Sequence, residues 1–289
     1  MNFQYHRNTL IKTDSDHPMV VEALGLLDNF EQIQEKFSQF QISVEDYILG
    51  ITPYDRFMFM NAKLKPQKTN PINTMQNKKY STYREQIWLP VWIRICSLLQ
   101  KLQNWQDVKL VVIQNKKLVE RVYKGGYLAY KDVDGGIAVE IKINNKTVLI
   151  PVIAVEDKGG HACKTCHSGV DAQGERIHKS FPNAIHIFIT DNHVTVGRDA
   201  QEFAHTNITI SERGYEGVQA DYDELRADRF AFVEKFLVET LSKMSPQDFT
   251  DYIEVVEDNR NYWSARAPTD TKPDGITVNY HPKIKIAIP

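Results

Sequence analysis

Two strand-like runs on either side of Asn144-Asn145 constrain the fold of this chain more than any other feature. The first run, residues 137–143, alternates between apolar and charged side chains, which is typical of a strand with one buried face. The second run, residues 146–155, is apolar on both faces after its first turn residues, which indicates a strand in the centre of a sheet. Because asparagine tolerates the positive φ of a tight turn, the two runs predict an antiparallel hairpin.

The rest of the chain predicts helices before the hairpin and a mixture of strands and helices after it. Residues 63–83 are polar and contain prolines, so they predict a long exposed loop. Pro90 suits the first turn of the helix that follows this loop. Apolar spacing predicts helices within 20–37, 44–48, 85–105 and 223–244, and strands at 108–113 and 184–189.

These elements predict an α/β fold with a central mixed β-sheet flanked by helices. We divide the chain into an N-terminal helical region, residues 1–106, which includes the polar and basic loop, and a second region, residues 107–289. The second region holds the sheet and the C-terminal helices.

Acidic residues stand at the end of the hairpin that is far from its turn. Side chains two apart on a strand share a face, so Glu156 and Lys158 point together and Asp157 points away. Pairing the strands across the turn without interruption leaves Asp134 on the other face from Glu156. One extra residue in the first strand restores the parity, and Gly135-Gly136 accepts the left-handed backbone that such a bulge needs.

With that bulge, we expect Asp134 to face Ala154, diagonal to Glu156, and Asp132 to lie opposite Glu156. Both aspartates are therefore candidate partners of Glu156, and we favour Asp134 because it directly precedes the strand. Pro151 lacks an N–H group, which indicates a bulge or a local break in the returning strand.

Two carboxylates and an ammonium group at one strand end suit metal-assisted hydrolysis of a phosphodiester. Carboxylate oxygens hold hard cations such as Mg²⁺. The ion polarises the phosphoryl oxygen and lowers the pKa of the attacking water. The Lys158 ammonium group neutralises charge that builds up on the phosphate. Acidic residues are also common at strand ends for structural reasons alone.

At these residues the chain resembles the PD-(D/E)xK nuclease superfamily and, within it, type II restriction endonucleases of the BbvCI-like group. The likeness runs through Lys131-Asp132-Val133-Asp134 and then through residues 149–158. It continues more faintly through residues 174–177 and the strand at Ile185.

The resemblance implies a mixed sheet flanked by helices and Mg²⁺-dependent, sequence-specific cleavage of double-stranded DNA. It also implies a homodimer, or a heterodimer with a related subunit. Asp134 (or Asp132) and Glu156 would bind the metal, and Lys158 would position or activate the water. On this interpretation residues 107–289 form the nuclease core.

The chain departs from the pattern of this superfamily at three places. No proline precedes the first aspartate, and Gly159-Gly160-His161 replaces the expected start of a helix. Asp157 occupies a position that is usually apolar or small.

Cys163 and Cys166, with His161 and His167 beside them, form a second candidate site. A C-x-x-C pair with neighbouring histidines can bind Zn²⁺. No second C-x-x-C exists in the chain, so the four zinc ligands would come from this stretch or from a distant histidine such as His178 or His205. The other interpretations are reduced thiols near the active site and a redox dithiol.

Basic residues outside the hairpin are candidate DNA contacts, namely Lys78, Lys79, Arg198 and Arg213. The net charge of −2 argues against a polycationic nucleic-acid coat but permits a local basic groove. The three tryptophans of residues 88–105 predict core packing rather than a base-stacking platform.

Composition favours a cytoplasmic protein without a membrane span. The chain has three cysteines, an odd number that argues against a disulfide scaffold. Its N-terminus has no apolar signal core, and no run is long and apolar enough to cross a bilayer.

Two other functions fit the same residues. The first is another PD-(D/E)xK nuclease that acts in repair, nicking or transposition. The second is a zinc-stabilised nucleic-acid-binding module in which the acidic cluster is only structural.

Overall fold

The computed structural model describes residues 4–12, 16–63, 71–72, 78–123, 127–143, 145–158, 169–170, 172–175, 177–178, 181–190, 206–209, 222–251 and 255–256. The helical elements within these ranges are α1 (Gln4–Ile11), α2 (Pro18–Ser38), α3 (Val44–Met58), the π-helix Phe59–Lys63, α4 (Lys78–Leu99), the 3₁₀ helix Gln103–Trp105, α6 (Ala227–Leu241) and α7 (Gln247–Thr250). The strands are β1 (Lys109–Tyr123), β2 (Tyr127–Ile143), β3 (Lys146–Lys158), β4 (Ile185–Thr190), β5 (Thr206–Thr209) and β6 (Val255–Val256).

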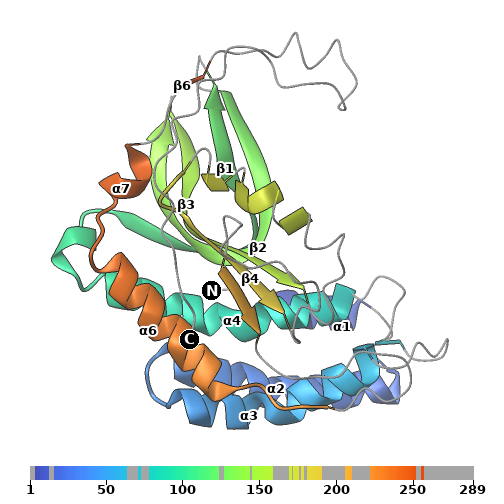
Figure 1. Ribbon diagram of the computed structural model, residues 1–289. Coiled ribbons are helices and arrows are strands. Elements are labelled where there is room, and N and C mark those ends of the chain that lie inside the picture. Colours follow the sequence, from blue (N-terminus) through green and yellow to red (C-terminus); the bar gives the residue numbers. More distant parts are fainter. Residues whose placement is uncertain are drawn as a thin grey trace, which may run out of the picture.

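The strands form one mixed sheet in the order β5-β4-β3-β2-β1-β6. Strands β1, β2 and β3 are an antiparallel meander, whereas β4 runs parallel to β3 and β5 runs parallel to β4. The predicted α/β class with a mixed sheet and packed helices is therefore confirmed. Figure 1 shows the sheet above a layer of helices.

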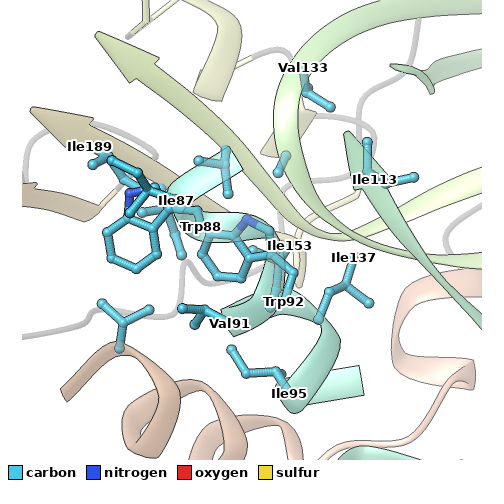
Figure 2. Close-up of a cluster of buried hydrophobic side chains, with 14 of the residues drawn as sticks. Ile87, Trp88, Val91, Trp92, Ile95, Ile113, Val133, Ile137, Ile153 and Ile189 are labelled. Atoms are coloured by element: carbon cyan, nitrogen blue, oxygen red, sulfur yellow. The ribbon is translucent and has the colours of Figure 1, made fainter. Parts of the chain in front are cut away.

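Helix α4 is the element that joins the sheet to the other helices. It contacts β1, β2 and β3 on one side and α1, α2 and α6 on the other (Figure 1). Trp88 and Trp92 lie at the centre of this contact, stacked on each other, and Trp88 also stacks on Phe230 of α6. Figure 2 shows both indoles surrounded by aliphatic side chains of α4 and of the sheet. The core role predicted for these tryptophans is confirmed, and Trp105 is buried as well.

A single buried apolar cluster contains side chains from both halves of the chain. Residues 4–105 are helical wherever they form regular structure in the described ranges, and the first strand begins at Lys109. The division at residue 106 stays a prediction about organisation, because the helices and the sheet are packed on each other through this shared core.

The helices before the sheet follow the predicted periodicity except near the start of α4. Ser43 caps α3, because its hydroxyl accepts a hydrogen bond from the backbone N–H of Asp46 at 3.0 Å. The predicted exposed loop over residues 63–83 is wrong at its end, since α4 begins at Lys78 and Tyr80 and Tyr83 are buried. Residues 64–70 and 73–77 lie outside the described part of the chain.

Pro90 lies in the interior of α4, so its predicted place in a first turn is also wrong. A proline there leaves the carbonyl of the residue four positions earlier without its helical donor. That residue is Gln86, and its carbonyl accepts a hydrogen bond from the side-chain amide of Gln34 on α2. The hydroxyl of Tyr47 on α3 donates to the next carbonyl, that of Ile87, at 2.6 Å. The Gln34 side chain therefore takes the place of the missing donor, and Tyr47 adds a hydrogen bond at the neighbouring carbonyl.

The central hairpin is confirmed in place and in register at its turn. Ile143 pairs with Lys146, and Asn145 has the positive φ of 64° expected for a tight turn. The register shifts between the pair Ile137–Ile153 and the pair Ala138–Pro151. Hence the extra residue is Val152 of β3, next to Pro151, where the missing N–H predicts an irregularity.

Gly135-Gly136 does not hold the bulge, so that prediction is wrong. Gly136 has a φ of 130°, which side-chain-bearing residues rarely adopt. A Cβ atom on Gly136 would also collide with the carbonyl oxygen of Ile153 on the neighbouring strand. Gly136 therefore allows the backbones of β2 and β3 to approach each other closely, and it is not part of a bulge.

No helix in the described part of the chain combines the length and the apolar character needed to cross a membrane.

Candidate metal-binding site at the end of the hairpin

The bulge at Val152 determines which residues face each other at the open end of the hairpin. The last pair of the β2–β3 ladder is Gly135 with Val155. Continued by one residue, this register places Asp134 directly opposite Glu156. The expected register, with Asp134 facing Ala154, is wrong, because Ala154 pairs with Gly136.

Directly opposite residues of an antiparallel pair share a face, with Cβ atoms about 5 Å apart. Asp134 and Glu156 therefore project from the same face of the sheet and are both half-buried. Asp132 is exposed and stands two residues earlier on that face, at the register position opposite Lys158. Thus the structure brings Asp134 closer to Glu156 than Asp132 along the ladder.

Helix α4 packs against the other face of the sheet at this point. A Cβ atom on Gly135 would lie 3.1 Å from the indole nitrogen of Trp92, so the face that carries Gly135 and its partner Val155 looks toward α4. Asp157, two residues after Val155, shares that face. Asp134 and Glu156 project from the opposite face, away from α4, as alternation requires.

The side chain of Asp157 is buried and forms an ion pair with Arg84 of α4. The Arg84 guanidinium donates from Nη2 and Nε to one oxygen of Asp157, Oδ1, at 3.0 and 3.3 Å. The two side chains are only 1% and 3% exposed. The arginine explains how a carboxylate is accommodated at a position where the resembled nucleases usually have an apolar or small residue.

The backbone of Asp157 also fixes the carboxylate of Asp134. Its N–H group donates to Asp134 Oδ2 at 2.8 Å. The β2–β3 ladder has ended by this point, so the Asp134 side chain supplies the acceptor that the next backbone carbonyl would otherwise provide. The Asp134 carboxylate is thereby held against the end of β3, beside Glu156.

A third contact holds β2 next to this pair. Gln173 lies in a short helical segment, residues 172–175, and its side chain is buried. The Gln173 amide lies 3.4 Å from the carbonyl oxygen of Asp132 and donates to it. On the other side of β3, Glu156 is in register with Phe188 of β4 and Lys158 with Thr190.

Asp134 and Glu156 offer two carboxylates as possible ligands. Within the described ranges, no group of three or more His, Cys, Asp or Glu side chains is placed to hold an ion. Mg²⁺ is commonly bound by one or two carboxylates and completes its octahedron with waters and substrate phosphate oxygens. Asp134 and Glu156, on one face at the end of a ladder, fit that requirement.

The remaining predicted site residues fall outside this cluster. Lys78 and Lys79 are the first two residues of α4. Arg198 and Arg213 lie outside the described residues, and so do the candidate zinc ligands His161, Cys163, Cys166 and His167. Cys96 is a buried free thiol in the core, and burial raises its pKa to about 12.

Two residues of this region were not predicted from the sequence, Arg84 and Gln173. Arg84 follows the stretch that the polar composition assigns to a loop, which hides its place on a buried helix face. One signal was available: a carboxylate at a buried strand position requires a cationic partner. Gln173 has no comparable signal, because its contact is with a backbone carbonyl.

No protein-family model matches this chain, and the comparison with curated proteins also gave no match.

Proposed function

We propose that this protein is a Mg²⁺-dependent endonuclease that hydrolyses phosphodiester bonds of double-stranded DNA in the manner of type II restriction enzymes. The observation that carries the proposal is the register of the hairpin after Val152. It sets Asp134 opposite Glu156 on one face, with Lys158 two residues further along β3 at the same-face position.

The roles of the residues follow from this arrangement. Asp134 and Glu156 would hold the ion through oxygen, and Lys158 would stand near the phosphate that is attacked. A bound Mg²⁺ supplies Lewis-acid polarisation of the phosphate and a more acidic water. The hydrogen bond from the Asp157 N–H to Asp134 keeps one carboxylate in position before the substrate arrives.

Support for DNA as the substrate comes from the resemblance of residues 131–134 and 149–158 to restriction endonucleases. A dimer, or a pair of related subunits, would supply one such site for each strand of the duplex. Another nuclease of the same superfamily would use the same three residues, and the cleavage pattern distinguishes the two, since a restriction enzyme yields discrete fragments.

The test is cleavage of a long DNA of known sequence with Mg²⁺, using Glu156→Gln and Lys158→Met as the decisive variants. Both should lower the cleavage rate by about a thousandfold, because each removes a group that acts on the developing charge. Binding to the same DNA in Ca²⁺ should stay close to that of the unaltered protein, since neither variant changes the fold.

Glu140→Gln and Lys142→Met are matched controls at the turn end of the same hairpin. They remove the same charges far from the proposed site and should cleave at the normal rate. Normal cleavage by either decisive variant, or no cleavage of any DNA by the unaltered protein, would refute the proposed function.

A further inference from the structure

We infer that Arg84 and Asp157 form a positioning pair, which sets the direction in which Glu156 and Lys158 leave the end of β3. The inference rests on the proposed nuclease function, because it assigns the pair a role in that reaction. Both side chains lie on the α4 side of the sheet, away from the proposed substrate side, so both act through their neighbours.

Asp157 is well placed for this role, because it lies between the two proposed site residues in the chain. Its side chain is bound from the α4 side by Arg84, at 3.0 Å. Its backbone N–H is bound to Asp134 at 2.8 Å. A strand residue held at both its side chain and its amide cannot rotate about the strand axis. Glu156 and Lys158, the residues before and after it, then project from the opposite face of the sheet.

An apolar side chain would be the ordinary choice for packing at position 157. Val155, two residues earlier on the same face, is buried, and so is Ile189, which pairs with Asp157 on β4. Burying an ion pair gives little or no net stability over apolar residues of similar volume, because both charges lose their hydration. What the charged pair adds is direction, since the guanidinium donates from both Nη2 and Nε to the same carboxylate oxygen and so fixes where that oxygen lies.

Arg84 can set a direction because the part of α4 that carries it is itself fixed. The preceding residue, Tyr83, donates its hydroxyl to buried Asp55 on α3 at 2.5 Å. Thr82 is hydrogen-bonded through its hydroxyl to His6 on α1 at 2.8 Å. These contacts lie on the helical side of α4, so the helix connects the helical layer to the end of β3.

The test compares the unaltered protein with the double variant Arg84→Met/Asp157→Leu, which replaces the ion pair by apolar side chains. Its melting temperature should stay close to that of the unaltered protein, whereas kcat should fall by about a hundredfold with KM for DNA little changed. The amide at position 157 should exchange its hydrogen about tenfold faster, because its bond to Asp134 loosens. The amides of residues 153–155 should keep their protection.

Arg84→Lys keeps the charge but loses the planar guanidinium group. Its kcat tests the inference if the double variant does not fold. A kcat reduced by about tenfold, at an unchanged melting temperature and KM, supports the inference. Normal kcat in the folded double variant, or in Arg84→Lys if the double variant is unfolded, overturns it.

Amide exchange separates this inference from the proposed function. If the unaltered protein cleaves no DNA, the proposed function has failed, and the exchange rate at position 157 still reports whether the pair sets the strand end. An unchanged exchange rate at position 157 in the folded double variant overturns the positioning role even when cleavage is present.

Discussion

The two sides of α4 bury polar groups in different ways. Toward the other helices, His6 is completely buried and neutral, with its two ring nitrogens hydrogen-bonded to hydroxyls, those of Thr82 and Tyr54, at 2.8 and 2.6 Å. Toward the sheet, Arg84 and Asp157 are buried as a charged pair. Protonation of His6 at low pH would place a charge in the core, so the stability of this side depends on pH. The ion pair is stable only while both of its charged partners are present. The two sides should therefore fail under different perturbations.

The sheet side should be most sensitive at Gly136, which allows β2 and β3 to approach each other beside the bulge. Gly136→Ala should lower the free energy of unfolding by about 4 kcal/mol or more, because the new methyl group meets the backbone of Ile153 and the φ of 130° becomes strained. Urea unfolding followed by circular dichroism measures the loss.

Gly25→Ala is the control for this substitution. Gly25 lies within α2 with open space around the position of a Cβ atom. Alanine there should raise the free energy of unfolding by about 0.5 to 1 kcal/mol, since it favours the helix. A Gly136→Ala protein as stable as the unaltered one would show that the hairpin does not need this close approach.

The charged pair itself is tested by removing one partner. Asp157→Ala leaves the Arg84 guanidinium buried and uncompensated, so the free energy of unfolding should fall by about 3 kcal/mol or more. The matched control is Glu140→Ala in the same hairpin, where the partner Lys109 is 68% exposed. That change should cost less than about 1 kcal/mol, because water screens the pair. An equal loss of unfolding free energy in both variants would show that the buried pair does not depend on its partners more than the exposed pair does.

The helical side should respond to pH instead. Burial, and secondarily the nearby positive charge of Arg7, lowers the pKa of His6 from 6.5 to about 3. The unfolded chain therefore takes up this proton first as the pH falls. The contribution of His6 is fully present above pH 6.5 and is lost progressively as the pH falls toward 3.

Between pH 6.5 and pH 5 this loss should amount to about 2 kcal/mol, which urea unfolding at the two pH values would measure. His6→Gln removes the titrating group and keeps a side chain that can hydrogen-bond to both hydroxyls. Its stability should vary less over the same interval. The same pH dependence in both proteins would show that His6 is not the group responsible.

The hairpin could be predicted because its signals are local. Alternation of apolar and charged residues, the apolar returning strand and the asparagines at the turn all act within a few residues of one another. The need for one extra residue followed from requiring Asp134 and Glu156 to share a face of the sheet. Its position did not, since both Gly135-Gly136 and Pro151 can interrupt a ladder, and the choice depends on which backbone loses its N–H partner.

The start of α4 could not be predicted because buried polar residues conceal the apolar stripe. Thr82, Arg84 and Gln86 are all buried, and each is the kind of residue that usually faces water. Thr82 and Arg84 are accommodated by partners far away in the chain, such as His6 and Asp157. Contacts of this range are absent from any local pattern, which is also why Arg84 was missed beside the candidate site.

The single inserted residue at Val152 has a consequence for comparing this chain with others. An alignment that treats β3 as an unbroken ladder with β2 assigns Glu156 and Asp157 to the wrong sides of the sheet.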